Sequence, residues 1–146
     1  MIRGRFERGE PVVDCVISIP ALGINSPERV KLLVDTGASR SVLQPADVRR
    51  IGVDPEQVSA DPRSEQWSGV GGSTLVLVTT ALLTFSEDSA RERPYRHLIG
   101  IAEPTISNLT LPSILGMDFI RHFRLTVSVR ENRVELEPLF DSAQRP

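Results

Sequence analysis

The chain has 146 residues, which is enough for one domain with a sizeable hydrophobic core. Its formal net charge of −2 and its pI near 5.7 give no electrostatic footprint for nucleic acid, so no nucleic-acid partner is expected. Its apolar stretches are too short to cross a membrane and its N-terminus lacks the apolar core of a signal peptide, so no membrane partner is expected either.

The first part of the chain alternates between extended segments and connections. Residues 1–11 are charged and hold two glycines, so we expect a loose arm. Residues 12–19 are rich in β-branched side chains and are predicted to form a strand. Its Cys15 is the single cysteine, which favours a small buried hydrophobe in a reducing, cytoplasmic setting. Residues 20–29 have turn chemistry, and the apolar residues 30–35 predict a strand buried on both faces.

The following part predicts short helices, a loop and hairpins. Residues 45–51 begin with proline and stop at Gly52, which predicts a short helix, whereas the polar residues 54–66 predict a surface loop. Between 65 and 85, two extended segments flank a glycine-rich tip, which predicts a hairpin. The remaining predicted elements are a strand at 94–101, a loop at 103–112, a short helix at 117–123, and a hairpin made of 124–129 and 133–139.

The chemically informative segment is the run from Leu32 to Ser39, which reads LLVDTGAS. An apolar strand ends at Asp35, and Thr36 and Gly37 then allow the backbone to turn sharply. A carboxylate at the end of a buried strand is unfavourable unless it is hydrogen-bonded, paired or used in chemistry. Asp35 is therefore a candidate catalytic acid, although the triplet alone is equally typical of an ordinary Asp-x-Gly turn.

Three motifs in this order resemble the retropepsin-like, or retroviral-type, aspartic proteases: residues 32–39, the glycine-rich 68–73 and the segment 113–120. The resemblance implies an all-β fold, a closed β-barrel or acid-protease half-lobe with a flap hairpin and one or two short helices. The chain would be a cellular or bacterial single-domain member. We therefore expect an N-terminal arm at 1–11, a protease domain at 12–138 and a C-terminal tail at 139–146.

The resemblance also implies how the catalytic residues would work. One Asp-Thr-Gly per chain implies a closed symmetric homodimer, because aspartic proteolysis uses two carboxylates. The two Asp35 side chains would share one proton, activate a water and hydrogen-bond the scissile carbonyl, so no metal or other cofactor is needed. In the family, the hydroxyl at Thr36 bonds the partner's loop and the Gly37 N–H holds the carboxylates coplanar.

The implied substrate-binding residues lie in the same loop and in the glycine-rich hairpin. Ala38 matches the retroviral pattern, whereas Ser39 and Met117 replace an acid and an arginine that retroviral members commonly carry, so cleavage preferences do not transfer. A hairpin tip without side chains can offer backbone N–H groups to an extended peptide. Trp67 supports the flap, lines a subsite or is a half-buried packing residue. The tip residues are Gly69, Val70, which is a candidate subsite wall, Gly71 and Gly72.

Other polar residues are expected to have structural roles. Gly116 would permit a close approach beneath the catalytic loop, and Asp118 would favour the N-terminus of the short helix and not act as a second acid. His97 and His122 are expected to be ordinary surface or packing residues. The hairpin at 124–139, with one apolar face, is a candidate dimer surface.

The leading functional hypothesis is a homodimeric aspartic endopeptidase that cuts extended segments of peptide or protein substrates. The alternative is a catalytically weak, dimeric peptide-binding or scaffolding module with the same fold. A strictly monomeric chain would be inactive, because one carboxylate cannot be acid and base in the same step.

Overall fold

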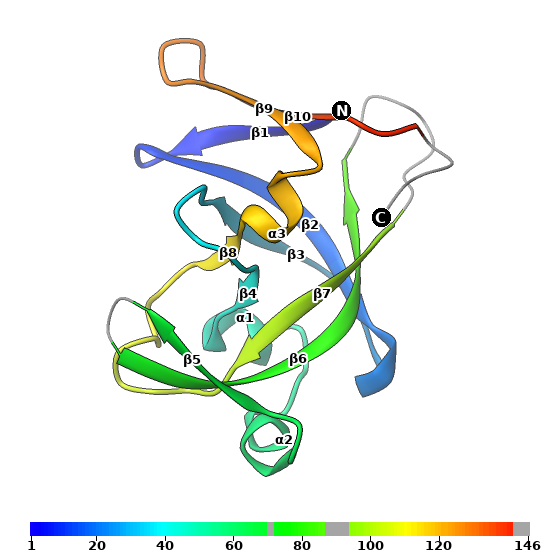
Figure 1. Cartoon of the computed structure of the whole chain (residues 1–146), viewed down its shortest axis with the longest axis vertical. Helices are drawn as coiled ribbons and strands as arrows, with labels where there is room; N and C mark the ends of the chain where they lie inside the picture. Colours follow the sequence, from blue (N-terminus) through cyan, green and yellow to red (C-terminus); the bar gives the residue numbers. More distant parts are fainter. Residues whose placement is uncertain (70–71, 87–93, 142–146) are drawn as a thin grey trace.

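The computed structural model describes residues 1–69, 72–86 and 94–141, and strands dominate it (Figure 1). The strands are β1 (Ile2–Glu7), β2 (Glu10–Ile19), β3 (Ile24–Val34), β4 (Val42–Leu43), β5 (Glu65–Gly69), β6 (Gly72–Phe85), β7 (Tyr95–Ala102), β8 (Ser113–Leu115), β9 (Phe123–Ser128) and β10 (Arg133–Pro138). The helices are a 3₁₀ turn η1 (Pro20–Leu22), α1 (Pro45–Arg50), α2 (Pro55–Ala60) and α3 (Met117–Ile120). The predicted all-β class with few short helices is confirmed.

The strands form one sheet in the order β5-β6-β7-β4-β8-β3-β2-β1-β10-β9, and β6 also pairs with β2. Strand β8 runs parallel to β3 on one side and antiparallel to β4 on the other. The loop that joins β3 to β4 therefore passes over the carboxyl end of β8. This loop contains the Asp-Thr-Gly triplet, so the topology itself sets the position of the candidate site.

The core contains an aromatic cluster that anchors the short helix α3 to the sheet. Phe85, Tyr95 and Phe119 are all buried, with ring centroids 5.5 to 5.9 Å apart. Phe119 also stacks on Phe123 at the start of β9, at 4.9 Å. A helix of four residues is not stable by itself, so tertiary packing of this kind must hold it in place. Cys15 is free and fully buried, which confirms the expected buried hydrophobe, and burial raises the pKa of its thiol.

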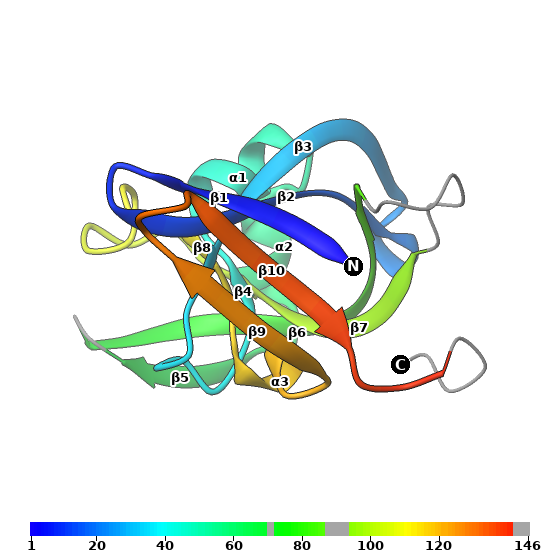
Figure 2. The ribbon, with the colours of Figure 1, turned by 90° about the horizontal axis from the view of Figure 1, so that it is seen from above.

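Residues 1–11 differ from the expected loose arm, because they contain β1 and the start of β2. Strand β1 lies beside β10 and pairs with β2 as well (Figure 2). Ile2 lies opposite Leu136 and is buried in the core, and the Phe6 N–H donates to Asn132 Oδ1 at 2.7 Å. The charged composition of the segment did not indicate this pairing, which combines a local hairpin with β2, turning at Arg8 and Gly9, and a distant partner in β10.

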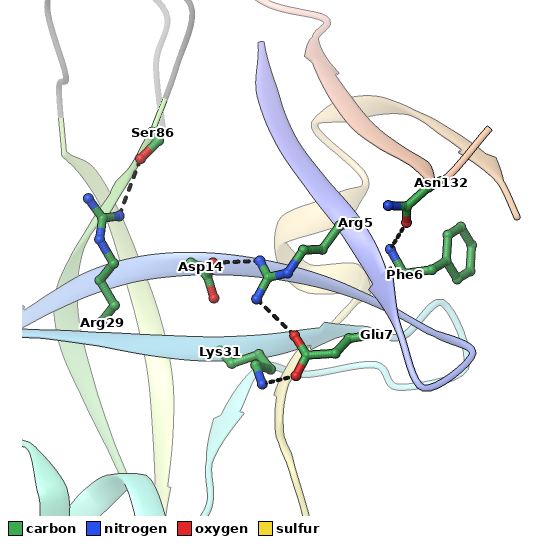
Figure 3. Close-up of polar contacts among 8 residues, drawn as sticks. All are labelled: Arg5, Phe6, Glu7, Asp14, Arg29, Lys31, Ser86 and Asn132. Atoms are coloured by element: carbon green, nitrogen blue, oxygen red, sulfur yellow. Dashed lines mark hydrogen bonds and ion pairs between the residues drawn. The ribbon is translucent and has the colours of Figure 1, made fainter.

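Charged side chains of β1 reach toward partners on β2 and β3 (Figure 3). Arg5 donates to Asp14 at 2.6 Å and to Glu7 at 2.9 Å, and Glu7 also pairs with Lys31. These ion pairs are largely exposed, and such pairs contribute little to stability. The position of β1 therefore depends mainly on its hydrogen bonds in the sheet and on the burial of Ile2.

Two further expectations are wrong in detail. Strand β3 begins at Ile24, so the connection before it is shorter than predicted. It is not buried on both faces, because Lys31 is exposed between the buried Val30 and Leu32.

The helices of the described residues are all too short to form a membrane-spanning segment.

The predicted loop at 54–66 contains the helix α2. Asp54 caps it by accepting from the Glu56 N–H at 3.0 Å, and Pro55 occupies the first helical position. Val58 is fully buried and packs the helix against the core. The capping signal was present in the sequence, but the single apolar residue gave no periodicity to support it.

Gly4 gives the first testable prediction. A Cβ atom at this position would lie 2.1 Å from the Val12 carbonyl oxygen and 2.7 Å from Val13 Cγ1. Gly4→Ala should therefore push β1 away from β2 and lower the free energy of unfolding by about 1–3 kcal/mol in urea titrations. Gly69→Ala is the matched control, since a Cβ there meets nothing within 4 Å. Equal stability of both variants would contradict the close packing of β1.

Candidate active site

Asp35 follows β3 directly and opens a tight turn at the end of the strand. Its N–H donates to the Leu115 carbonyl at 3.1 Å, which continues the pairing of β3 with β8 by one residue. The Ala38 N–H donates to the Asp35 carbonyl at 3.3 Å, and the Gly37 N–H donates to Asp35 Oδ1 at 2.9 Å. The carboxylate is thus held by its own turn, with partial exposure to solvent.

The turn rests on the backbone of Gly116, at the end of β8. A Cβ atom on Gly116 would lie 2.6 Å from both the carbonyl carbon and the carbonyl oxygen of Arg40. The Met117 N–H donates to the Ala38 carbonyl at 2.8 Å, and the Asp118 N–H donates to the Ser39 carbonyl at 3.2 Å. The predicted close approach at Gly116 is confirmed, and no side chain would fit there.

A polar network fixes the inner side of the loop. Ser41 is fully buried, and its hydroxyl donates to Asp118 Oδ1 at 2.7 Å while accepting from the Gly116 N–H at 2.9 Å. The Ser41 N–H donates to Asp118 Oδ2 at 3.0 Å, and His97 Nε2 lies 3.1 Å from the same oxygen. Asp118 stands in the first turn of α3, as expected, but its main partners are on the loop and on β7.

The surroundings of Asp118 favour its ionised form. Partial burial raises the pKa of this carboxyl, but the contact with His97 and the two hydrogen bonds from Ser41 outweigh that effect. The pKa of Asp118 therefore lies below its ordinary value. A carboxylate held in this way serves as an anchor for the loop.

A cleft of about 940 Å³ lies between the loop, the β5–β6 hairpin and the segment 103–112. Most of the predicted site residues line it, whereas Thr36 is exposed beside it, and Val70 and Gly71 lie outside the described residues. The predicted residues that line the cleft are Asp35, Gly37, Ala38, Ser39, Trp67, Gly69 and Gly72.

Several lining residues were missed by sequence reasoning. Arg40 and Glu65 flank the predicted segments by one or two positions, so the motif boundaries excluded them. Leu111 comes from the loop at 103–112, which carried no motif. Asn108 shapes that loop, because it accepts from the Thr105 N–H at 2.8 Å and donates to the Glu103 carbonyl at 2.8 Å. The signal available in the sequence was an asparagine among turn-forming residues, which can order a loop through its side chain.

Besides carboxylate, backbone and apolar groups, the candidate site contains the arginine Arg40 and several hydroxyl and amide side chains. No cluster of three or more His, Cys, Asp or Glu that could hold a metal ion occurs among the described residues. None of the ion pairs found in the described part of the chain involves Asp35. The chemistry that these residues can support is acid–base activation of water by a carboxylate.

Comparison with known proteins gives a family and a fold. Residues 21–122 match a family model described as gag-polyprotein putative aspartyl protease. The chain is similar to a retropepsin-like aspartic protease from Rickettsia conorii, with a TM-score of 0.58 and 17% identity, covering 92% of this chain and 95% of that one. This likeness confirms the predicted fold. No curated protein sequence matches significantly.

Two further solved structures are similar at lower TM-scores. The EIAV protease complexed with the inhibitor HBY-793 gives a TM-score of 0.48 and 21% identity, with coverage of 78% of this chain and 88% of that one. The retroviral protease-like domain of Ddi1 from Leishmania major gives 0.41 and 16%, with coverage of 87% and 94%.

The Asp118 network predicts a pH-dependent contribution to stability. Because the folded-state pKa lies below the ordinary value of 3.8, this contribution is present above that value and is lost as the pH falls through the folded-state pKa. Asp118→Asn should lower the free energy of unfolding by about 1–3 kcal/mol near neutral pH. The difference from wild type should shrink progressively below about pH 4.

Urea titrations at several pH values test this prediction. Glu28→Gln is the control, because that exposed carboxylate lies away from the loop and makes only a loose ion pair with the exposed Arg50 among the described residues, at 3.9 Å. A difference between wild type and Asp118→Asn that stays constant with pH would show that the charge of Asp118 does not contribute.

Proposed function

This chain belongs to the family of gag-polyprotein aspartyl proteases and has the retropepsin-like fold, and we propose that it is a homodimeric aspartic endopeptidase that hydrolyses extended peptide segments. The observation that carries the proposal is the position of Asp35 in the cleft together with the hydrogen bonding of its carboxylate. This carboxylate lines the cleft and, among the described residues, accepts a hydrogen bond from Gly37 alone, while Asp118 is occupied as a structural anchor.

The proposed mechanism needs two chains. The Asp35 carboxylates of both chains meet across a twofold axis and share one proton, because two like charges so close cannot both ionise. The ionised carboxylate accepts a proton from a bound water, which attacks the scissile carbonyl carbon. The protonated carboxyl donates a hydrogen bond to the carbonyl oxygen and stabilises the tetrahedral intermediate. The pair titrates as a unit, so neither role belongs to one chain.

Two neighbours of Asp35 have surroundings that suit this mechanism. Thr36 is exposed in the single chain, which supports the proposal that its hydroxyl bonds the partner's loop. The Gly37 N–H already donates to Asp35 Oδ1, which supports its proposed role in orienting the carboxylate.

The proposed substrate is an extended peptide bound along the cleft. The hairpin of β5 and β6 borders the cleft, and Gly69 pairs with Gly72 at the end of its described ladder. Backbone groups without side chains can pair with peptide groups of a substrate. We include Val70 and Gly71 in this proposed contact, as well as Ala38, Ser39 and Trp67 along the walls.

The β9–β10 hairpin is the proposed dimer surface. Its tip projects beyond the rest of the molecule (Figure 1). Val127 lies opposite the buried Val134, so both side chains point to the same face of the hairpin, yet Val127 is 51% exposed. Val129 is 71% exposed. A partner subunit that covers the tip would bury these valines, as the core of the chain buries Val134.

The domain limits and the compartment stay proposals. We propose a protease domain at residues 12–138, to which β1 from residues 1–11 adds a strand, followed by a tail at 139–146. We propose the cytoplasm as the compartment, with peptide or protein substrates and without nucleic acid or membrane as partners. The free and buried Cys15 is compatible with a reducing environment.

Asp35→Asn should abolish cleavage, because the amide can neither share the proton nor activate the water. We expect kcat to fall by about 10³-fold or more in a peptide-library digest across acidic to neutral pH. Asp54→Asn is the matched control, since asparagine also caps α2 and should leave cleavage unchanged. Equal cleavage by wild type and Asp35→Asn would remove the protease proposal, and peptide binding by wild type without turnover would favour the binding module.

Val127→Asp with Val129→Asp should weaken the dimer, because two charges would be placed on a surface that the partner covers. Sedimentation should show a shift from dimer to monomer, and cleavage per chain should fall with it. Leu98→Asp is the control, since this leucine on β7 is 60% exposed and lies outside the hairpin. A wild-type protein that is monomeric at all concentrations and still cleaves peptides would contradict the twofold mechanism.

A further inference from the structure

Trp67 packs against a bare stretch of backbone beside the catalytic loop. A Cβ atom on Gly100 of β7 would lie 2.6 Å from Trp67 Cη2 and 2.7 Å from Trp67 Cζ3. The six-membered part of the indole therefore fills the space that any other residue at position 100 would need. The Gly100 N–H donates to the Ser41 carbonyl at 3.1 Å, so this contact surface is itself bonded to the end of the loop.

Two charged side chains hold the other sides of the indole. The Arg40 guanidinium lies over the ring, with its Cζ atom 4.9 Å from the centroid. The indole Nε1–H donates to Glu65 Oε1 at 2.9 Å, and Arg40 Nη1 donates to the same oxygen at 3.2 Å. Each of the three side chains thus contacts the other two.

The three residues come from two separate elements. Arg40 belongs to the loop that carries Asp35, whereas Glu65 and Trp67 lie at the start of β5, the first strand of the hairpin. All three line the same cleft as Asp35. Arg40 is 57% exposed and Glu65 is 53% exposed, so a single ion pair between them would contribute little. The stacking on Trp67 and the shared acceptor give the cluster a defined geometry.

We propose that Arg40, Glu65 and Trp67 form a latch that fixes the base of the β5–β6 hairpin to the catalytic loop and thereby sets one wall of the cleft. The proposal rests on the proposed function in taking this cleft as the substrate site. The three are positioning residues, because they hold β5 at a set place relative to Asp35 without touching the reacting groups. Loss of these contacts should raise KM for a peptide substrate more than it lowers kcat.

Trp67 is the only tryptophan of the chain, so its fluorescence reports on the latch without any need for activity. Arg40→Met removes the stacked cation, and Glu65→Ala removes the shared acceptor. Both should make the indole more accessible to acrylamide and shift its emission to the red. Arg63→Met is the control, since that exposed arginine pairs with Asp61 within its own turn and should leave the fluorescence unchanged.

Peptide cleavage gives the second measurement. Both latch variants should raise KM about two- to fivefold with little change in kcat, the factor expected from loss of an exposed cation–π contact in Arg40→Met and of the shared hydrogen-bond acceptor in Glu65→Ala. Unchanged Trp67 emission and quenching in folded Arg40→Met and Glu65→Ala would overturn the latch. A protein that cleaves no peptide would remove the proposed function, while the fluorescence would still decide whether the latch exists.

Discussion

The constraint on which the candidate site depends is the contact between the loop that carries Asp35 and Gly116, where backbone meets backbone without room for a Cβ atom. Strand β8 lies between β3 and β4, so the loop that connects these two strands has to cross the end of β8. Had residue 116 a side chain, the loop would be lifted, and the hydrogen bonds of the Ala38 and Ser39 carbonyls with α3 would be lost. The position of Asp35 therefore depends on a residue 81 positions later in the chain (116 − 35).

The carboxylates of Asp35 and Asp118 lie close to the same loop but have different surroundings. Asp118 receives two hydrogen bonds from Ser41 and a contact from His97, and these favour its ionised form. Asp35 receives one hydrogen bond from its own turn and faces the cleft. A structural carboxylate is stabilised when its hydrogen-bonding capacity is filled within the fold. A carboxylate that acts on water and substrate must keep part of that capacity for them, and this supports the proposal that Asp35 is the catalytic acid.

The parts of the fold that were predicted correctly depend on local sequence. The turn at Asp35, the helix after Pro45, the hairpin at Gly69 and the hairpin at Asn132 are specified by neighbouring residues. The missed parts have two causes. Strand β1 forms a local hairpin with β2 through the turn at Arg8 and Gly9, but the charged composition of residues 1–11 hid that turn, and its second neighbour β10 lies at the other end of the chain. The contact of His97 with Asp118 requires the register of β7, which no local pattern specifies.

Successive residues of the loop hold it from opposite sides. Ser41 is buried and binds Asp118 on the inner side, whereas Arg40 is exposed and contacts Trp67 and Glu65 on the side of the cleft. The inner contacts fix the loop relative to the core, and the outer contacts relate it to the hairpin. Ser39 and Met117 carry no charge, so no ion pair can join the loop to α3 at these positions. Instead, the buried hydroxyl of Ser41 joins the loop to α3 through its hydrogen bond with Asp118. The side of the loop that faces the cleft can therefore interact with the hairpin.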